Sequence, residues 1–186
     1  MRLKSKQFIE YIRADLDARK QHLNPYYFVV DPITRFHWYL RLLEFLQTRL
    51  IFMPIFIVIK FLFLRLSQRL GFSIPINTLG KGVYLPHWGP IVINSKAKVG
   101  ANCVIHVDVV IGQHPSSKLS VPEIGRSVYI APGVKLFGDI KIGDYCVIRA
   151  NSVVSKSMKS KSLIVGIPGE IIKQVSEKML LDYGLK

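Results

Sequence analysis

Cysteine is scarce in this sequence. Among 186 residues there are two, Cys103 and Cys146, and neither belongs to a CxxC pair. This content argues against a disulfide framework and a cysteine-based zinc site, and it favours a reducing cytoplasm. The amino terminus mixes acids and bases before any apolar run, so no secretory signal peptide is expected.

Acidic residues are also few. Asp and Glu number 12 against 26 Lys and Arg, which gives a formal net charge of +14. Such a charge indicates an anionic partner: phosphate groups, a nucleic acid or an acidic membrane surface. The basic residues are dispersed and no recognised nucleic-acid module is present, so nucleic-acid binding is not expected. With 49% hydrophobic residues, the chain can bury one core and is not of the disordered class.

The arrangement of apolar residues along the sequence changes near residue 71. Upstream, residues 1–70 predict a helical segment, in which Asp31 and Pro32 start an amphipathic helix over 34–47. Downstream, residues 71–172 carry isolated, regularly spaced aliphatic residues and predict the main domain. Residues 173–186 predict a short terminal helix.

A six-residue period runs through the main domain. Aliphatic residues recur at Leu79, Leu85, Ile93, Val99, Ile105, Ile111, Ile124, Ile130, Leu136, Ile142, Ile148 and Val154. Two steps are long: Leu85 to Ile93, and Ile111 to Ile124, where residues 112–123 must leave the repeat as a loop. One unit is a strand and a turn, and three units close a triangular coil whose stacking buries the aliphatic column. The period therefore predicts a mainly β protein with a parallel β-helix, and it disfavours a β-sandwich.

The stretch 74–172 resembles the left-handed β-helix hexapeptide acyltransferases. The matching pieces are IPINTLGKGVYLPHWGPIVIN, KVGANCVIHVDVVIG, PEIGRSVYIAPGVKLFGDIKIGDYCVIRANSVVSK and the closing VGIPGEII. Within that family it is similar to the branch of serine acetyltransferases and glycan O-acetyltransferases. The resemblance implies acetyl-CoA as the acyl donor, no metal, and a homotrimer, because the family's sites lie in grooves between adjacent β-helices.

His87 is the candidate catalytic residue. It lies in the unit with two extra residues, which pushes a turn out of the smooth wall of the β-helix. Transfer of an acetyl group from a thioester to an alcohol needs a base near neutral pKa, and imidazole fits. The alternative, a histidine on a surface turn, is disfavoured by the surrounding motif.

Four further residues are candidates for acceptor binding. They are Trp88, His106, Asp108 and His114, the last at the start of the 112–123 loop, which in the family helps to wall the site. Surface roles for His106 and His114 remain open alternatives. Zinc binding by the three histidines is disfavoured, because they are spaced too widely for the tight pair of the β-helical carbonic anhydrases.

The resemblance also implies a coenzyme A site. Small turn residues would let the cofactor approach the backbone, and a polar pair would contact its phosphates. These cofactor-binding candidates are Gly112, Ala131, Gly133, Ala150, Ser155 and Lys156. The alternative is a solvated basic turn at the end of the β-helix. Cys103 and Cys146 occupy interior repeat positions and are expected in the core.

Several positions depart from the serine acetyltransferase pattern. Pro86 stands where that pattern has an Asp before the histidine, neither Phe72 nor Ser73 supplies the second expected Asp, and Val121 replaces a loop histidine. These departures favour a hydroxyl of a cell-envelope or capsule glycan as the acceptor. Serine O-acetylation in cysteine biosynthesis is the alternative, and a non-catalytic β-helix scaffold is a further one.

Residues 50–64 are almost all apolar, and basic residues flank them. Their 15 residues, which include Lys60, are too few for a membrane-spanning helix. A helix lying on an anionic leaflet fits the composition, and so does a helical cap packed against the trimer or against the base of the β-helix. The sequence therefore predicts a cytoplasmic protein and leaves association with the inner face of a membrane open.

Overall fold

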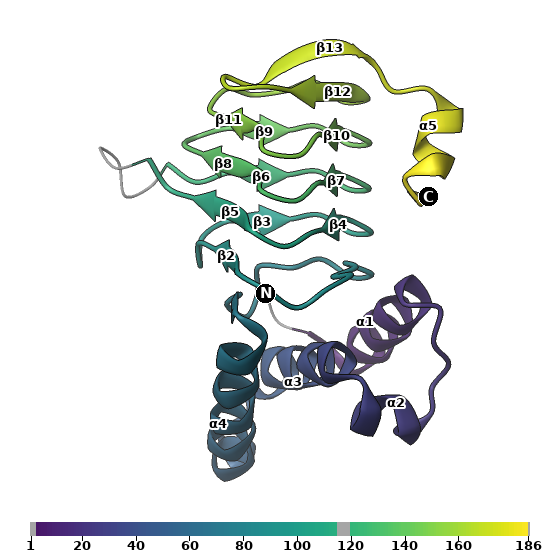
Figure 1. The fold of residues 1–186 in the computed structure, drawn as a ribbon. Helices are drawn as coiled ribbons and strands as arrows, with labels where there is room; N and C mark the ends of the chain where they lie inside the picture. Colours follow the sequence, from purple (N-terminus) through teal and green to yellow (C-terminus); the bar gives the residue numbers. More distant parts are fainter. Residues whose placement is uncertain (1–2, 115–119, 186) are drawn as a thin grey trace.

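The computed structural model describes residues 3–114 and 120–185, and it shows a parallel β-helix with helices at both ends (Figure 1). Five helical elements come first: α1 (Ser5–Ala18), α2 (Pro25–Val30), α3 (Pro32–Leu46), the short 3-10 helix η1 (Leu50–Phe52) and α4 (Met53–Leu70). Of the predicted loop over 112–123, the end residues Gly112 and Glu123 belong to strands, and residues 115–119 lie outside the described ranges.

The β-helix is built from very short strands in three sheets. Sheet A has the order β1 (Phe72–Ser73), β2 (Ile91–Ile93), β5 (Val109–Gly112), β8 (Lys135–Phe137) and β11 (Val153–Val154). Sheet B has β3 (Lys98–Val99), β6 (Glu123–Ile124) and β9 (Lys141–Ile142). Sheet C has β4 (Val104–Ile105), β7 (Tyr129–Ile130), β10 (Val147–Ile148), β12 (Ser162–Val165) and β13 (Glu170–Gln174).

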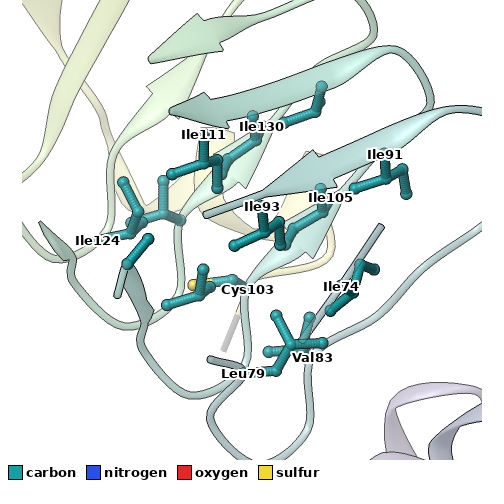
Figure 2. Packing of buried hydrophobic residues seen from close by; sticks show 14 of the residues in the cluster. Ile74, Leu79, Val83, Ile91, Ile93, Cys103, Ile105, Ile111, Ile124 and Ile130 are labelled. Atoms are coloured by element: carbon teal, nitrogen blue, oxygen red, sulfur yellow. The ribbon is translucent and has the colours of Figure 1, made fainter. Parts of the chain in front are cut away.

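Stacked aliphatic residues form the interior of the coil. Ile130 pairs in parallel register with Ile105 below and Ile148 above, and Ile124 pairs with Ile142 in sheet B. Every predicted repeat start is at most 5% exposed, and Figure 2 shows several of them packed around Cys103. Burial of one such side chain contributes about 1.5–3 kcal/mol, so the stack stabilises the coil throughout its length. The predicted left-handed β-helix, with its helical start and short terminal helix, is confirmed.

Local signals in the sequence set the helix ends. The side chain of Asp31 accepts hydrogen bonds from the backbone N–H groups of Ile33 and Thr34, and Pro32 occupies the first position of α3. Gly71 ends α4 with a φ of 76°, a left-handed conformation that glycine adopts without strain. These signals explain why α3 begins at Pro32 and why α4 ends at Leu70, next to the change in sequence pattern near residue 71.

A buried arginine joins the helices to the β-helix. Arg41 of α3 is 0% exposed, and its guanidinium donates to Asp15 Oδ2 at 2.8 Å and Glu44 Oε2 at 2.9 Å. It also donates to the carbonyl oxygens of Leu79 at 2.9 Å and Gly80 at 2.6 Å. Because α1, α3 and the first coil all contribute acceptors, this network fixes the helices against the lower end of the β-helix.

The two ends of the chain differ in how they cover the β-helix. α5 (Glu177–Asp182) begins later than the expected boundary at residue 173, because Lys173 and Gln174 complete the antiparallel strand β13. α4 packs on α3, where the ring of Phe63 stacks on that of Phe36 at 5.2 Å, and it leaves most of its other apolar side chains exposed. Among the described residues, no helix is long and apolar enough to cross a membrane.

Candidate active site

His87 lies on a turn between sheets C and A in the first coil. The turn follows Tyr84, which bridges to Val104 of sheet C, and it precedes β2 of sheet A. It is tied at its end, since the N–H of Gly89 donates to the carbonyl oxygen of Leu70 at 2.8 Å. Gly89 has a φ of 143°, and a Cβ there would lie 3.0 Å from a methyl group of Val107, so glycine fits this turn best. The two extra residues therefore leave the wall of the coil and carry an exposed imidazole.

A second histidine stands beside it on the next coil. The ring centroids of His87 and His106 are 6.3 Å apart, and the His106 ring lies 5.0 Å from that of Tyr129. His106 directly follows β4, and its N–H donates to the carbonyl oxygen of Ile130 at 3.1 Å. The backbone ladder of sheet C thus positions His106 between the other two rings.

Burial decides the protonation states in this row of rings. Partial burial lowers the pKa of His106, and the neighbouring His87 lowers it further, so the His106 imidazole is neutral at pH 7. Burial, and after it the adjacent Tyr183, raises the pKa of Tyr129, which keeps that hydroxyl protonated. The row therefore offers His87 two uncharged neighbours that can exchange hydrogen bonds with a substrate.

A cleft of about 410 Å³ opens at this row. Its walls come from the end of α1, the outer face of sheet C and the end of α5. The residues that line it are Ala18, Arg19, Lys20, Tyr84, Pro86, Val104, His106, Tyr129, Tyr183 and Gly184. His106 lines the cleft and His87 is exposed beside it, so a hydroxyl bound in the cleft can come close to an imidazole.

The other predicted acceptor residues make no described contact with the histidine pair. Trp88 is 66% exposed and its ring makes no described contact with either histidine. The carboxylate of Asp108 accepts a hydrogen bond from Lys135 Nζ at 2.8 Å. His114 is exposed, and its N–H donates to the carbonyl oxygen of Ser120 at 3.1 Å at the base of the loop. The structure thus brings together His87 and His106 but not the full predicted set.

The predicted coenzyme A residues divide between two edges of sheet A. One edge, which we call the histidine edge, is formed by the turns that lead from sheet C to sheet A. It carries His87, His106, Ala131, Gly133 and Ala150 on successive coils. The other edge, which we call the loop edge, follows the ends of β5 and β11 and carries Gly112, His114, Ser155 and Lys156.

Small residues let a ligand approach the histidine edge, whereas the loop edge is more polar. Gly133 has a φ of 76°, and Ala150 lies in an exposed turn. On the loop edge, Lys156 Nζ contacts Glu170 Oε1 at 2.6 Å in an exposed pair. The two cysteines are buried and free, and burial raises the pKa of the Cys103 thiol to about 12. Neither cysteine can therefore serve as a nucleophile at this surface.

The tyrosines of the cleft were not among the residues predicted from the sequence. Tyr84 and Tyr129 each stand directly before a repeat start, an outward-facing position of sheet C. That outward position was a signal in the sequence, because aromatic rings there cannot enter the core. Tyr183 had no such signal, since only the folding of α5 over sheet C brings its ring within 4.7 Å of Tyr129.

Comparisons with known proteins agree with the fold. Residues 122–156 match the model described as bacterial transferase hexapeptide (six repeats). Serine acetyltransferase from Staphylococcus aureus (strain Mu50) is 40% identical over 101 residues, which cover 54% of this chain and 47% of the relative. The Staphylococcus epidermidis protein of the same name is 38% identical over 106 residues, 56% of this chain and 50% of the relative. The chain thus spans about half the length of the curated relatives it matches.

Solved structures extend the similarity to the helical segment. Serine acetyltransferase from Brucella abortus has a TM-score of 0.74 and 25% identity, over 92% of this chain and 71% of that one. Its complex with coenzyme A gives a TM-score of 0.74 and 26% identity, over 92% and 70%. The resemblance to hexapeptide-repeat acyltransferases is therefore confirmed.

Proposed function

We propose that this protein is an acetyl-CoA-dependent O-acetyltransferase in which His87 acts as the general base. The observation that carries the proposal is the position of His87, an exposed imidazole on the extended turn at the mouth of a cleft, beside a neutral His106. Relatives named serine acetyltransferase and a related structure with coenzyme A support the reaction class and the donor.

The chemistry needs one base and no covalent enzyme intermediate. His87 takes the proton of the acceptor hydroxyl while that oxygen attacks the thioester carbonyl carbon. The tetrahedral intermediate then expels the thiolate of coenzyme A, which receives the proton from His87. The neutral imidazole of His106 keeps one ring N–H, which can donate a hydrogen bond to the acceptor or to the developing oxyanion. A metal ion has no role in this scheme, and the described residues contain no cluster that could hold one.

The donor would lie along the histidine edge. Ala131, Gly133 and Ala150 offer backbone groups on successive coils to the extended arm of coenzyme A. Ser155 and Lys156 are the candidates for its phosphates, and Lys156 can turn from its exposed partner Glu170 at little cost, since such pairs contribute about 0–1 kcal/mol.

A homotrimer would join the two halves of the donor site. The histidine edge and the loop edge lie at opposite ends of the sheet A strands, so a donor held between two neighbouring subunits can contact one edge of each. In a ring of three copies, the histidine edge of one faces the loop edge of the next. We therefore propose that each complete site is shared by two subunits.

Two acceptors have separate support. Serine is favoured by the names of the relatives. A glycan hydroxyl is favoured by the lining of the cleft, whose described residues include tyrosines and basic residues but no carboxylate for the ammonium group of serine. Pro86, which lines the cleft directly before His87, is one of the positions where an acidic residue is missing.

The test measures release of coenzyme A from acetyl-CoA by the full chain, with L-serine and with cell-envelope sugars as acceptors. We expect His87→Ala to lower kcat about 10²- to 10⁴-fold while binding of acetyl-CoA persists. His22→Ala, an exposed histidine outside the cleft, is the matched control and should match the wild type. Failure to bind acetyl-CoA, or full activity of His87→Ala, would refute the proposal.

We further propose a cytoplasmic location with contact to an anionic membrane face through residues 50–64. The exposed apolar side chains there include Ile57, Val58 and Phe61, and Lys60 and Arg65 stand among them. We expect the protein to sediment with phosphatidylglycerol vesicles and Phe61→Asp to release it. Lack of vesicle binding, with α4 protected from proteolysis only in the oligomer, would favour packing within the trimer instead.

A further inference from the structure

Three arginines meet at a hollow between α3 and α4, which Figure 1 shows below the β-helix. Arg35 and Tyr39 stand one turn apart on α3, and Arg65 and Arg69 stand one turn apart on α4, so each pair shares a face of its helix. The hollow has a volume of about 210 Å³. Its lining residues are Arg35, Tyr39, Phe61, Leu62, Arg65, Leu66 and Arg69, none of which lines the cleft beside His106.

The structure shows no carboxylate paired with these three arginines. In the part of the chain that it describes, every ion pair involves other residues. α4 contains no acidic residue, and Glu44, the only one in α3, binds the buried Arg41. Asp31, which precedes α3, accepts hydrogen bonds from Arg19. The hollow therefore concentrates positive charge that described protein groups leave unpaired.

Arg35 is held at the hollow and is short of one hydrogen-bond acceptor. Its NH2 group donates to the carbonyl oxygen of Val29 at 3.0 Å, and its guanidinium lies 6.0 Å from the centre of the Phe28 ring. Its Nε is buried and has no partner among the described residues. A buried N–H without an acceptor is unfavourable, so an acceptor supplied from outside the chain would stabilise this side chain.

The wall that α4 contributes is partly apolar. Phe61 and Leu62 are 60% and 39% exposed, and the guanidinium of Arg65 lies 5.9 Å from the centre of the Phe61 ring. A group bound by the arginines therefore lies beside accessible apolar surface. Such a wall can contact the carbon part of a charged ligand.

We infer that this hollow is a binding site for the phosphate group of an ester with an apolar substituent. The planar guanidinium presents two N–H groups in a fork that matches two phosphate oxygens, and a phosphate monoester carries about two negative charges at pH 7. Arg35 turns its free Nε to the phosphate, while Arg65 and Arg69 bind from α4 and the Tyr39 hydroxyl is a further donor. The inference goes beyond the proposed transferase reaction, because the hollow shares no residue with the cleft.

Isothermal titration calorimetry of the full chain at constant ionic strength tests the site. The probes are dihexanoyl phosphatidic acid, which is soluble and carries an apolar part, and inorganic phosphate. We expect Arg35→Gln and Arg69→Gln each to weaken binding of the lipid probe at least about tenfold, because each removes a charged hydrogen-bond donor. Arg69→Lys keeps the charge and should weaken binding less. Arg13→Gln, which changes an exposed arginine of α1, is the matched control and should bind like the wild type.

The arms of the experiment also distinguish the source of the phosphate. Sedimentation with phosphatidic acid vesicles that Arg69→Gln weakens indicates a membrane lipid. Binding of the soluble probes without vesicle binding indicates a free phosphate ester, and it refutes the membrane contact of residues 50–64 while the phosphate site stands. Equal affinity for the two soluble probes supports the phosphate site and refutes the contribution of the apolar wall.

Two results would overturn the site: no binding of either soluble probe, or an equal loss in Arg13→Gln and Arg69→Gln, which would indicate unspecific attraction to a basic protein. Arg69 is exposed, so its variants decide the matter even if Arg35→Gln unfolds, and a thermal melt of each variant checks this. Release of coenzyme A by a wild type that binds no phosphate probe refutes this site and leaves the transferase proposal standing. Phosphate binding without acetyl-CoA binding refutes the transferase proposal alone.

Discussion

Replacement of Arg41 by Met should destabilise the protein strongly, because it removes the centre of the buried network. The guanidinium donates to the carboxylates of Asp15 and Glu44, whose side chains are 3% and 0% exposed, and to two carbonyl oxygens of the first coil. Methionine fills part of the volume but donates no hydrogen bond. The change leaves two buried carboxylates and two carbonyl groups without this donor.

The magnitude follows from burial. Removal of one partner from a buried ion pair typically costs about 3–5 kcal/mol, since the remaining charge is uncompensated. Here one cation serves two carboxylates, so we expect the upper part of that range. Arg126→Met is the matched control, because Arg126 and its partner Asp144 are 62% and 41% exposed. An exposed pair contributes under about 1 kcal/mol.

The pH dependence of the stability difference between Arg41→Met and the wild type is an independent test of this network. Although burial alone raises the pKa of Asp15, the neighbouring Arg41 and His37 and the hydrogen bonds that Arg41 donates lower it below 3.8. The wild type therefore keeps this contribution above the ordinary Asp pKa and loses it as the pH falls through the lower folded-state value. Without Arg41, burial should raise the pKa of Asp15. The stability deficit of the variant should then shrink as the pH falls from 7 toward 4.

Urea unfolding at one protein concentration and at several pH values measures both effects. We expect a much lower midpoint for Arg41→Met than for Arg126→Met at pH 7, with the gap narrowing in acid. Equal midpoints for the two variants, or a gap that widens as the pH falls, would refute the reasoning about the buried network.

Three further predictions concern the β-helix itself. Ile130→Ala should cost about 2–5 kcal/mol in urea unfolding, because it opens a cavity in the interior stack, whereas Val29→Ala on the exposed face of α2 should change little. An equal loss of stability in the two variants would contradict the burial of Ile130 in the interior stack. Gly133→Ala should cost about 1–2 kcal/mol and lower the melting temperature, since φ is 76° and the new Cβ would meet Asn151 Oδ1 at 2.0 Å; an unchanged melting temperature would count against this turn. Both cysteines should react slowly with a thiol reagent at pH 8 until the chain unfolds, because burial raises their pKa values, that of Cys103 to about 12; rapid reaction in the native state would contradict their burial.

The coil was predictable from the sequence because its period is local. A six-residue repeat of aliphatic residues forces strand and turn to alternate, and every predicted repeat start is buried in the structure. The start of α3 was predictable for a similar reason, since Asp31 and Pro32 are a capping signal within one turn. The beginning of α5 was misjudged by a few residues, because pairing of β13 with β12 is a tertiary contact.

The candidate site was only partly predictable. The two extra residues around His87 predict a protruding turn, and the resemblance to the acyltransferases implies that His87 acts as a base. The partners of that histidine depend on how coils stack: His106 comes beside it through the ladder of sheet C, whereas Asp108 pairs with Lys135. Residue spacing alone does not tell these two outcomes apart.

The sequence by itself determined the scaffold and the exposed position of His87, because a repeat specifies its own neighbours through short-range geometry. Only the tertiary structure decided the cleft. Its walls come from α1 and α5, which are far apart in the chain, and meet because Arg41 holds the amino-terminal helices to the first coil while apolar contacts hold α5 to sheet C. Contacts between such distant segments leave no period in the sequence, so their geometry emerges only when the whole chain has folded.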